Sequence, residues 1–287
     1  RKLASQTNGV FFLRVEDTDQ KREVENAVSG IVSSLKDFAI EPDEGMVSDE
    51  DGKGNYGPYK QSQRKEIYDI VINELIKKGR AYPCFCHTSE LNEIRTIQEQ
   101  QKERTGYYGK YAKCRDLSPE EAIKRIENNE PYIIRFRSLG DFSNKIKVHD
   151  LIRGDLELSQ NDLDIVIRKS DGLPTYHFAH LVDDHFMHTT TVIRGEEWLP
   201  SLPIHVELFE SLGFEPPQYA HLPVIMKIDN GKRRKLSKRY DEEAAVSYFI
   251  EAGYPKEAII EYLFTLANSN YEEWRMSHPS YKDFKMS

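Results

Sequence analysis

A basic segment near the C-terminal end of the sequence has the composition of a phosphate-binding site. Between Lys227 and Arg239 there are seven cations and one anion, Asp229. The segment contains the order Lys235-Leu236-Ser237-Lys238-Arg239, with Gly231 before it. Two lysines three residues apart, on a flexible loop hinged at Gly231, can close over a polyphosphate and neutralise charge that develops during a reaction. The alternative interpretation is a solvated charged face.

Strands and helices alternate around this segment. Apolar runs and alternating patterns predict strands at 10–13, 132–137, 148–158, 165–167, 191–193 and 222–226. Helical spacing predicts helices at 24–38, 67–79, 88–104, 201–212 and 240–268, and Ser118, Pro119 and Glu121 are typical of a further helix start. The alternation is interrupted and then resumes. It therefore predicts one doubly wound α/β domain with a parallel sheet and a second domain inserted in it.

The composition limits the classes of protein to consider. The 287 residues are the length of about two domains. The net charge of −8 argues against a nucleic-acid binder that depends on bulk charge. No apolar run reaches the ~18 residues of a membrane span, so we expect a cytoplasmic protein without a membrane partner. The three cysteines, all between Cys84 and Cys114, predict a reducing compartment rather than a disulfide framework.

Two patterns in the sequence resemble binding motifs without fitting them. The segment 52–57 has the spacing G-x-G-x-x-G, but no apolar strand precedes it, so we interpret it as a mobile loop. The second pattern is a group of histidines and aspartates: His177, His180, Asp183, Asp184, His185 and His188. If this segment is extended, adjacent side chains point to opposite faces and cannot converge on one ion. A catalytic metal is therefore not predicted there. No G-x-x-x-x-G-K-[ST] motif occurs in the sequence.

Five stretches resemble glutamyl-tRNA synthetases, which are class I aminoacyl-tRNA synthetases. Lys235–Arg239 is similar to the Lys-Met-Ser-Lys-Ser loop of that class, and the other four stretches are Leu13–Asp19, Asp171–His177, Val182–His185 and Val192–Leu199. The resemblance implies a Rossmann-like catalytic domain at 1–80 and 175–230. It also implies an inserted α+β domain at 81–174 that binds the acceptor stem, and the start of a helical stem-contact domain at 231–287.

The activity that the resemblance implies is the ATP- and Mg²⁺-dependent attachment of glutamate to tRNA(Glu). Glu16 would pair with the substrate's ammonium group and Arg194 would hold a carboxylate, and both follow predicted strands, where ligands of open α/β sheets bind. The alternative for Glu16 is a surface carboxylate at a helix start. The resemblance assigns the amino-acid pocket to Tyr176, His177, Phe178, Ala179 and His180. It assigns catalysis to Lys235 and Lys238, and ATP binding to Glu197, Lys235, Leu236, Ser237, Lys238 and Arg239.

The sequence departs from the family pattern in two places. His180 stands where asparagine is usual, and no His-x-Gly-His motif occurs. In the family this motif lies upstream of the position of Arg1, so we expect the catalytic fragment of a longer, monomeric enzyme. The resemblance implies that discrimination between tRNA(Glu) and tRNA(Gln) depends largely on the anticodon-binding part of such an enzyme. Two alternatives stay open: a shorter relative that glutamylates a tRNA base, and a non-catalytic tRNA-binding fragment.

The cysteines form the pair Cys84-x-Cys86 with Cys114 further along the chain. Three thiolates suit tetrahedral Zn²⁺, and the resemblance implies a structural zinc in the inserted domain for some members of the family. Candidates for a fourth ligand are Tyr111, Asp116 and His87. The alternative is three reduced cysteines without a metal.

Overall fold

A computed structural model describes residues 1–19, 27–237 and 240–285. The chain forms two compact units. The first unit consists of Arg1–Lys60, Gly195–Glu197 and Leu222–Ser287, and the second of Gln61–Arg194 and Trp198–His221. In the described part of the chain, no helix is long and apolar enough to cross a membrane. The limits predicted for the domains stay a prediction.

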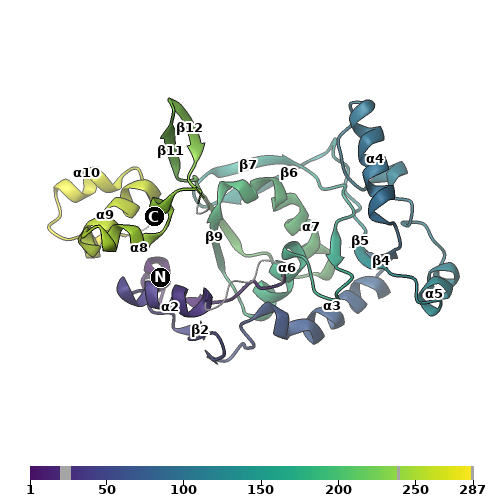
Figure 1. Ribbon diagram of the computed structural model, residues 1–287, viewed down its shortest axis with the longest axis horizontal. Coiled ribbons are helices and arrows are strands. Elements are labelled where there is room, and N and C mark those ends of the chain that lie inside the picture. Colours follow the sequence, from purple (N-terminus) through teal and green to yellow (C-terminus); the bar gives the residue numbers. More distant parts are fainter. Residues whose placement is uncertain (20–26, 238–239, 286–287) are drawn as a thin grey trace. The chain divides into compact units, whose positions relative to one another are not determined.

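The first unit contains a small sheet and a group of helices (Figure 1). In the sheet, β1 (Phe12–Leu13) is parallel to β2 (Glu44–Met46), which is antiparallel to β3 (Gly52–Lys53). The helices are α1 (Lys2–Gln6), α2 (Ala27–Asp37), α8 (Val246–Glu251), α9 (Lys256–Ala267) and α10 (Tyr271–Met276). The strand predicted at 10–13 and the helix predicted at 24–38 are confirmed in shorter form, although residues 24–26 lie outside the described part. Gly52 and Lys53, which we expected in a loop, form a strand because they pair with β2.

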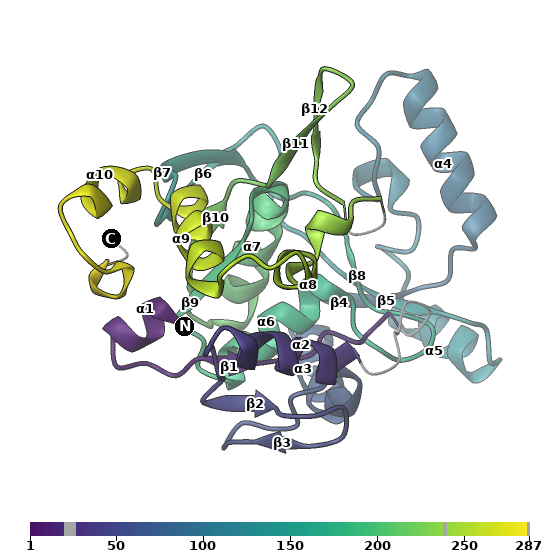
Figure 2. The ribbon, with the colours of Figure 1, turned by 60° about the vertical axis from the view of Figure 1, so that its left-hand side comes forward.

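The basic segment forms a hairpin rather than a hinged loop. Strands β11 (Met226–Asp229) and β12 (Lys232–Lys235) are antiparallel, and in Figures 1 and 2 the hairpin extends away from helices α8–α10. Its two turn residues, Asn230 and Gly231, have φ angles of 48° and 75°. Asn-Gly with positive φ at both positions is typical of a type I′ turn. Gly231 is therefore a turn residue of a hairpin, and its role as a hinge stays a prediction.

The second unit contains two sheets. In one, β4 (Ala81–Cys84), β5 (Ile133–Phe136) and β8 (Val166–Arg168) are antiparallel neighbours. The other has the order β7-β6-β10-β9, with strands β6 (Lys145–Asp150), β7 (Gly154–Ser159), β9 (Thr191–Gly195) and β10 (Gln218–Leu222). Strands β6 and β10 are parallel. The strand predicted at 222–226 is wrong: Pro223, which has no N–H to donate to a ladder, follows the last residue of β10.

Five helices complete the second unit. They are α3 (Lys65–Lys77), α4 (Thr88–Gln100), α5 (Pro119–Glu127), α6 (Tyr176–Phe186) and α7 (Leu202–Leu212). Side chains of α3, α6 and α7 form one apolar core with β5 and β8, and a second core lies around Cys84, Tyr107 and Ile94. Figures 1 and 2 show α4 and α5 at the end of this unit remote from β9. Helices, mixed sheets and the parallel pairs β1/β2 and β6/β10 confirm the α/β class.

The segment with the histidines and aspartates is the helix α6, so the assumption of an extended segment is wrong. Its apolar side chains Phe178, Leu181 and Val182 are fully buried, which explains why the segment is helical: these positions form one face at helical spacing. Asp183, also fully buried, lies on the same helix. It accepts hydrogen bonds from Arg64 Nε (2.7 Å), Gln61 Nε2 (2.9 Å) and the Tyr68 hydroxyl (2.9 Å). This carboxylate fastens α6 to the start of α3.

The Arg64–Asp183 pair gives a test of this joint. Replacing Arg64 with methionine leaves a buried carboxylate without its cation, so we expect a loss of about 3–5 kcal/mol in the free energy of unfolding, measured by urea denaturation. Arg95→Met is the matched control, because Arg95 pairs with Glu99 on the exposed face of α4 and such pairs contribute less than about 1 kcal/mol. Equal losses in the two variants would contradict the assignment.

Candidate active site

Arg194 lies at the centre of a group of polar and aromatic side chains in the second unit. Its Nε donates to His221 Nε2 (3.0 Å), and its Nη1 donates to the Tyr176 hydroxyl (3.3 Å). Both terminal nitrogens, Nη1 and Nη2, lie 3.2 Å from the same acceptor, Nδ1 of His205. The guanidinium carbon lies 4.8 Å from the ring centroid of Tyr219. Within the described residues, the arginine is thus held by neutral groups and no carboxylate contacts it directly.

The hydrogen bonds determine the tautomers of the histidines around Arg194. An arginine only donates, so His205 Nδ1 has to accept and His205 Nε2 carries the proton that it shares with His177 Nδ1 at 3.0 Å. Burial, assisted by the charge of Arg194, lowers the pKa of His205 far below its ordinary value. Burial likewise lowers the pKa of His177 to about 4. At neutral pH both imidazoles are therefore uncharged, as their bonds require.

The predicted pocket residues divide between this group and the core. Tyr176 and His177 contact it directly, and the Tyr176 ring also packs on Trp198 at 4.2 Å. His180 is buried and bonds through Nε2 to the Tyr219 hydroxyl at 2.9 Å. Phe178 and Ala179, in contrast, are fully buried in the apolar core of α3, α6 and α7. A helix directs successive side chains to different sides, so a pocket lined by the side chains of all five residues does not fit this geometry.

Glu16 lies in the first unit, directly after the end of β1. Val15 forms the last parallel bridge, to Lys60, and the Glu16 side chain beyond it is 43% exposed. One carboxylate oxygen lies 3.5 Å from Arg14 Nη2. The expected place beyond the carboxyl end of a strand is confirmed, whereas its role with an ammonium group stays a prediction.

Lys235 and Glu197 form an ion pair in the first unit. Lys235 Nζ lies 2.5 Å from Glu197 Oε1, and this contact lowers the pKa of the carboxyl group. A Cβ at position 195 would lie 2.0 Å from Glu197 Oε2, so any larger residue there would displace the carboxylate of this ion pair. Two residues that the resemblance assigns to ATP binding thus lie together. Lys238 and Arg239 lie outside the described residues.

Asp241 organises the segment that leads to these residues. Its carboxylate is bonded by two nitrogens of Arg234 at 2.7 Å each, by Lys227 Nζ (3.0 Å) and by the backbone N–H of Ser237 (2.9 Å). The hydrogen bonds from Arg234 are the main reason that the pKa of Asp241 is lowered. The backbone N–H of Leu236 is held by Ile225 O (2.9 Å). Asp241 therefore neutralises part of the charge of Lys227 and Arg234, and fewer cations of the 227–239 segment are available to a ligand than the sequence suggests.

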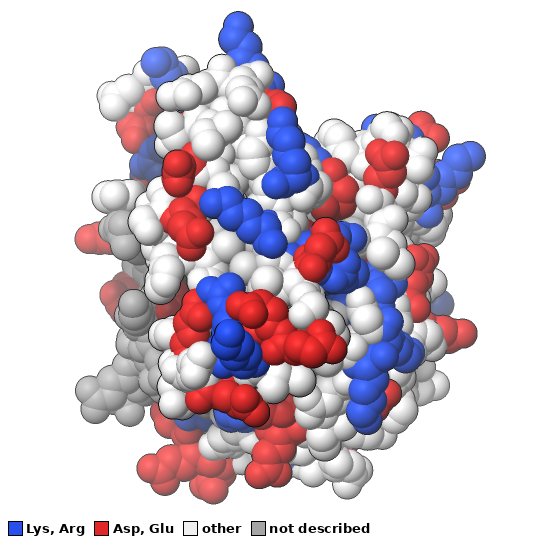
Figure 3. Space-filling model, turned by 90° about the vertical axis from the view of Figure 1, so that its right-hand side faces the viewer, with Lys and Arg blue, Asp and Glu red and all other residues white. Residues whose placement is uncertain are grey.

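The surface charge is mixed. On the face drawn in Figure 3, acidic and basic side chains are interspersed. This distribution agrees with the net charge of −8 and with the view that cations at particular places, not a broad basic field, would contact an anionic ligand.

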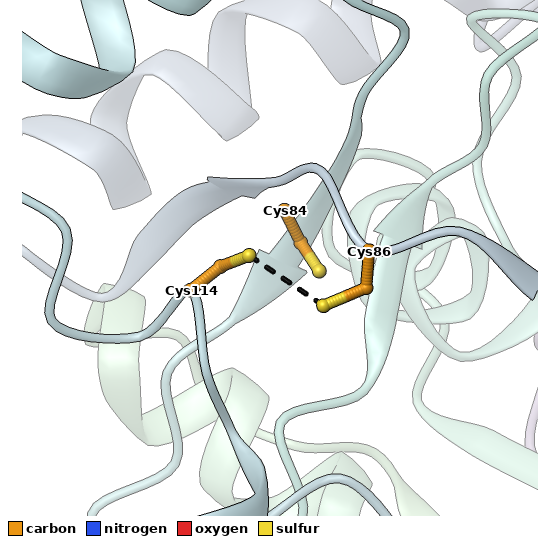
Figure 4. Close-up of side chains that lie close together, drawn as sticks. All are labelled: Cys84, Cys86 and Cys114. Carbon is orange, nitrogen blue, oxygen red and sulfur yellow. Dashed lines mark hydrogen bonds between the residues drawn. The ribbon is translucent and has the colours of Figure 1, made fainter. Parts of the chain in front are cut away.

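The three cysteines converge in the second unit (Figure 4). Their Sγ atoms all lie within 4.8 Å of one another, and those of Cys86 and Cys114 are 3.6 Å apart. Zinc–sulfur bonds of about 2.3 Å in a tetrahedron put sulfurs about 3.8 Å apart. Hydrogen bonding, first with Cys114, lowers the pKa of Cys84 to about 4, whereas the same contact raises the pKa of Cys114 and burial raises that of Cys86. The donor set therefore fits a zinc ion.

Tyr107 is the further side chain that the structure brings to the cysteines. Its hydroxyl lies 3.5 Å from Cys84 Sγ and 3.3 Å from Cys86 Sγ, and it accepts from the backbone N–H of Cys114 (3.0 Å). The three candidates for a fourth ligand have other contacts. Tyr111 donates to Glu103 (2.8 Å), exposed Asp116 pairs with Arg137 (3.3 Å), and His87 caps α4. The expectation that one of these three completes the group is thus not met by the structure.

Sequence reasoning missed Asp150, His205, His221, Asp241 and Tyr107. His221 had a detectable signal, because a polar residue inside an apolar strand needs a buried partner. The partner itself, Asp150, is remote in sequence, and its carboxylate lies 2.6 Å from His221 Nδ1. The other three residues gave no such signal.

The comparisons with known proteins agree with this fold. The family described as "tRNA synthetases class I (E and Q), catalytic domain" matches residues 2–277. The chain is 56% identical to the glutamate–tRNA ligase of Clostridium beijerinckii, over 99% of this chain and 52% of the relative. It is 53% identical to that of Clostridium perfringens (strain 13 / Type A), over 99% of this chain and 53% of the relative. The chain thus spans about half the length of these curated relatives.

A solved structure gives the same result. The crystal structure of a glutamate tRNA ligase from Elizabethkingia meningosepticum, in complex with its amino acid, matches with a TM-score of 0.78 and 37% identity over 90% of this chain and 54% of that chain. The fold is therefore that of a class I aminoacyl-tRNA synthetase. Within this class, the chain belongs to the family of catalytic domains described for the glutamate and glutamine enzymes. The resemblance noted in the sequence is confirmed.

The neutral histidines predict how stability depends on pH. An unfolded histidine titrates near 6.5, whereas His177 titrates at about 4 in the folded protein. Between these values the unfolded chain binds a proton that the folded protein does not, so the free energy of unfolding falls as the pH is lowered, by up to about 1.4 kcal/mol per pH unit for each such histidine. When the pH is lowered from about 7 to 5, we expect the free energy of unfolding, measured by urea denaturation, to fall less in His177→Gln than in wild type. His149→Gln, at an exposed position, is the control. Identical slopes in wild type and His177→Gln would contradict this assignment.

Proposed function

We propose that this chain carries the catalytic part of a glutamate–tRNA ligase. Glutamate and ATP would form glutamyl-adenylate and pyrophosphate, and the glutamyl group would then pass to the 3′ end of tRNA(Glu). The observation that carries the proposal is Arg194, a guanidinium held in place by neutral acceptors. Such a cation keeps its charge available for an anionic ligand. The names of the relatives support the same substrate class.

The contacts of Arg194 indicate how a carboxylate would bind. Its terminal nitrogens share one neutral acceptor, His205 Nδ1, at 3.2 Å each. A carboxylate offers two charged oxygens in a geometry that matches the guanidinium fork, so it would satisfy these nitrogens better than one imidazole lone pair. Tyr176, His177 and His180 would border the bound amino acid. Glu16 is proposed to pair with its ammonium group.

The proposed first step needs no strong base. The α-carboxylate oxygen of glutamate is already ionised when it attacks the α-phosphorus of ATP, and the bond to the pyrophosphate oxygen breaks. Lys235, with Lys238 beyond the described residues, would stabilise the charge on the phosphates, and Mg²⁺ would share in this neutralisation. The Glu197–Lys235 ion pair holds the ammonium group until the nucleotide binds. Leu236, Ser237 and Arg239 would complete the ATP contacts.

Further parts of the proposal concern RNA, zinc and cellular location. The 81–174 segment is proposed to contact the tRNA acceptor stem, and a monomer in the cytoplasm is the form that we expect. Cys84, Cys86 and Cys114 are proposed to hold a structural Zn²⁺, with the Tyr107 hydroxyl beside them. When bound, zinc would cross-link the loop at Cys114 to the end of β4.

Lys235 provides the test of the chemical step. In the full-length protein, we expect Lys235→Ala to lower the rate of glutamate-dependent ATP–pyrophosphate exchange by about 100-fold or more, with a much smaller change in the KM for glutamate. Lys232→Ala is the matched control, because Lys232 is an exposed cation on the same strand. A wild-type protein without glutamate-dependent exchange would contradict the function. Modification of a tRNA base instead of the 3′ end would support the base-glutamylating alternative.

Zinc binding has its own test. We expect metal analysis after dialysis to find about one zinc ion per chain in the purified wild-type protein. The Cys84→Ser variant is expected to contain no zinc. Tyr107→Phe is expected to lower the zinc affinity about 10–100-fold, whereas Tyr111→Phe, whose hydroxyl bonds to Glu103, keeps wild-type affinity. Metal-free wild-type protein that binds no added zinc would overturn the assignment.

A further inference from the structure

Asp150 is a buried carboxylate at the end of β6, and no part of the reaction described above uses it. Its Oδ1 accepts from the backbone N–H groups of Arg153 (2.9 Å) and Ile152 (3.0 Å), and its Oδ2 lies 2.6 Å from His221 Nδ1. Burial by itself would raise the pKa of this group, but the hydrogen bonds, led by that from His221, lower it. Asp150 is therefore ionised at neutral pH and accepts from each of these partners.

An ionised Asp150 determines the tautomer of His221. A carboxylate can only accept, so His221 Nδ1 carries the proton and Nε2 has a free lone pair. That lone pair accepts from Arg194 Nε at 3.0 Å. The other tautomer would direct an N–H at the N–H of the arginine and lose both hydrogen bonds. Burial, opposed by the bond to Asp150, lowers the pKa of His221, so the imidazole stays neutral beside the guanidinium.

The sheet places these three residues on neighbouring strands. Its order is β7-β6-β10-β9, and Asp150, His221 and Arg194 belong to β6, β10 and β9. Tyr219 pairs with Asp150 in the parallel register, and its ring lies against the guanidinium at 4.8 Å. The Tyr219 hydroxyl is held by His180, which in turn lies 2.5 Å from Asp184. Two aspartate–histidine pairs thus hold the groups that contact Arg194.

We propose that Asp150 is a positioning residue for substrate recognition: by fixing the tautomer of His221, it fixes the guanidinium of Arg194 in the orientation that receives the carboxylate of the amino acid. This inference rests on the proposed role of Arg194. Asp150 does not touch the substrate, and it belongs to the segment that the sequence assigned to the inserted domain. Substrate recognition would then depend on residues from both the 81–174 segment, which contains Asp150, and the 175–230 segment, which contains Arg194 and His221.

Asp150→Asn is the variant that separates positioning from folding. The amide oxygen can still accept from the N–H groups of Ile152 and Arg153, so the turn after β6 is kept. The amide NH₂ then faces His221 Nδ1 and forces the opposite tautomer. Asp155→Asn is the matched control, since Asp155 also lies 2.7 Å from a histidine Nδ1, that of His149, but on an exposed face of the same hairpin.

The kinetic readout is the KM for each substrate in ATP–pyrophosphate exchange by the full-length protein. Loss of a hydrogen bond to a charged group predicts a rise of about tenfold or more in the KM for glutamate in Asp150→Asn, with the KM for ATP unchanged. Asp155→Asn is expected to keep both values. In a His221→Gln background, Asp150→Asn should cause no further rise, because no imidazole tautomer remains to be fixed.

The structural readout is the tautomer of His221, observed by ¹⁵N NMR of labelled protein. We expect the proton on Nδ1 in wild type and on Nε2 in Asp150→Asn. An unchanged tautomer, or wild-type exchange with an unchanged KM for glutamate in Asp150→Asn, would overturn the inference alone. A wild-type protein without glutamate-dependent exchange would overturn the proposed function, and the glutamate role of Asp150 with it.

Discussion

A guanidinium inside a protein has to find an acceptor for its donors without losing the charge that makes it useful. Arg194 meets this constraint through His221, His205 and Tyr176, all of which are neutral, and through the face of the Tyr219 ring. A carboxylate in direct contact would satisfy the donors better but would compete with an anionic substrate. The negative charge is instead one residue further away, on Asp150. The pKa values of His177, His205 and His221 are all lowered, mainly by burial, which keeps the surroundings of the arginine uncharged.

Carboxylates that accept several hydrogen bonds, buried Asp183 and half-buried Glu207, connect segments elsewhere in the second unit. Asp183 fastens α6 to α3 through Arg64, Gln61 and Tyr68. Glu207 on α7 accepts from Arg80, Ser138 and Asn161, which lie on three separate segments. Each of these carboxylates accepts from several donors at once. Their hydrogen bonds compensate the free-energy cost of removing the carboxylate from water only when all the donors are in place. These hydrogen bonds therefore favour one particular arrangement of the segments. Apolar contacts, which are not directional, would define that arrangement less well.

In the first unit the same principle separates structural cations from chemical ones. Asp241 binds Arg234 and Lys227 of the hairpin, and it also accepts from the backbone N–H of Ser237. Among the described residues, Lys235 pairs only with the exposed carboxylate of Glu197, and an exposed pair is weak enough to exchange for a phosphate. The basic segment is thus a structural hairpin that ends in a residue suited to phosphates.

The sequence by itself determined the α/β class, most of the helices and the residues that resemble the family's site, because these depend on local periodicity and on short motifs. It also located Glu16 just beyond a strand and brought three cysteines into one segment, whereas Arg194, predicted just beyond a strand, lies within β9. It did not determine that 176–186 is a helix with Phe178 and Ala179 in the core, that Asn230-Gly231 closes a hairpin, or that Tyr107 joins the cysteines. Nor did it reveal the contacts of Asp150 with His221 and of Asp241 with Arg234. These depend on which strands become neighbours and on which buried donors meet a carboxylate, and only the tertiary structure decides that, since the partners are remote in sequence and each is unremarkable alone.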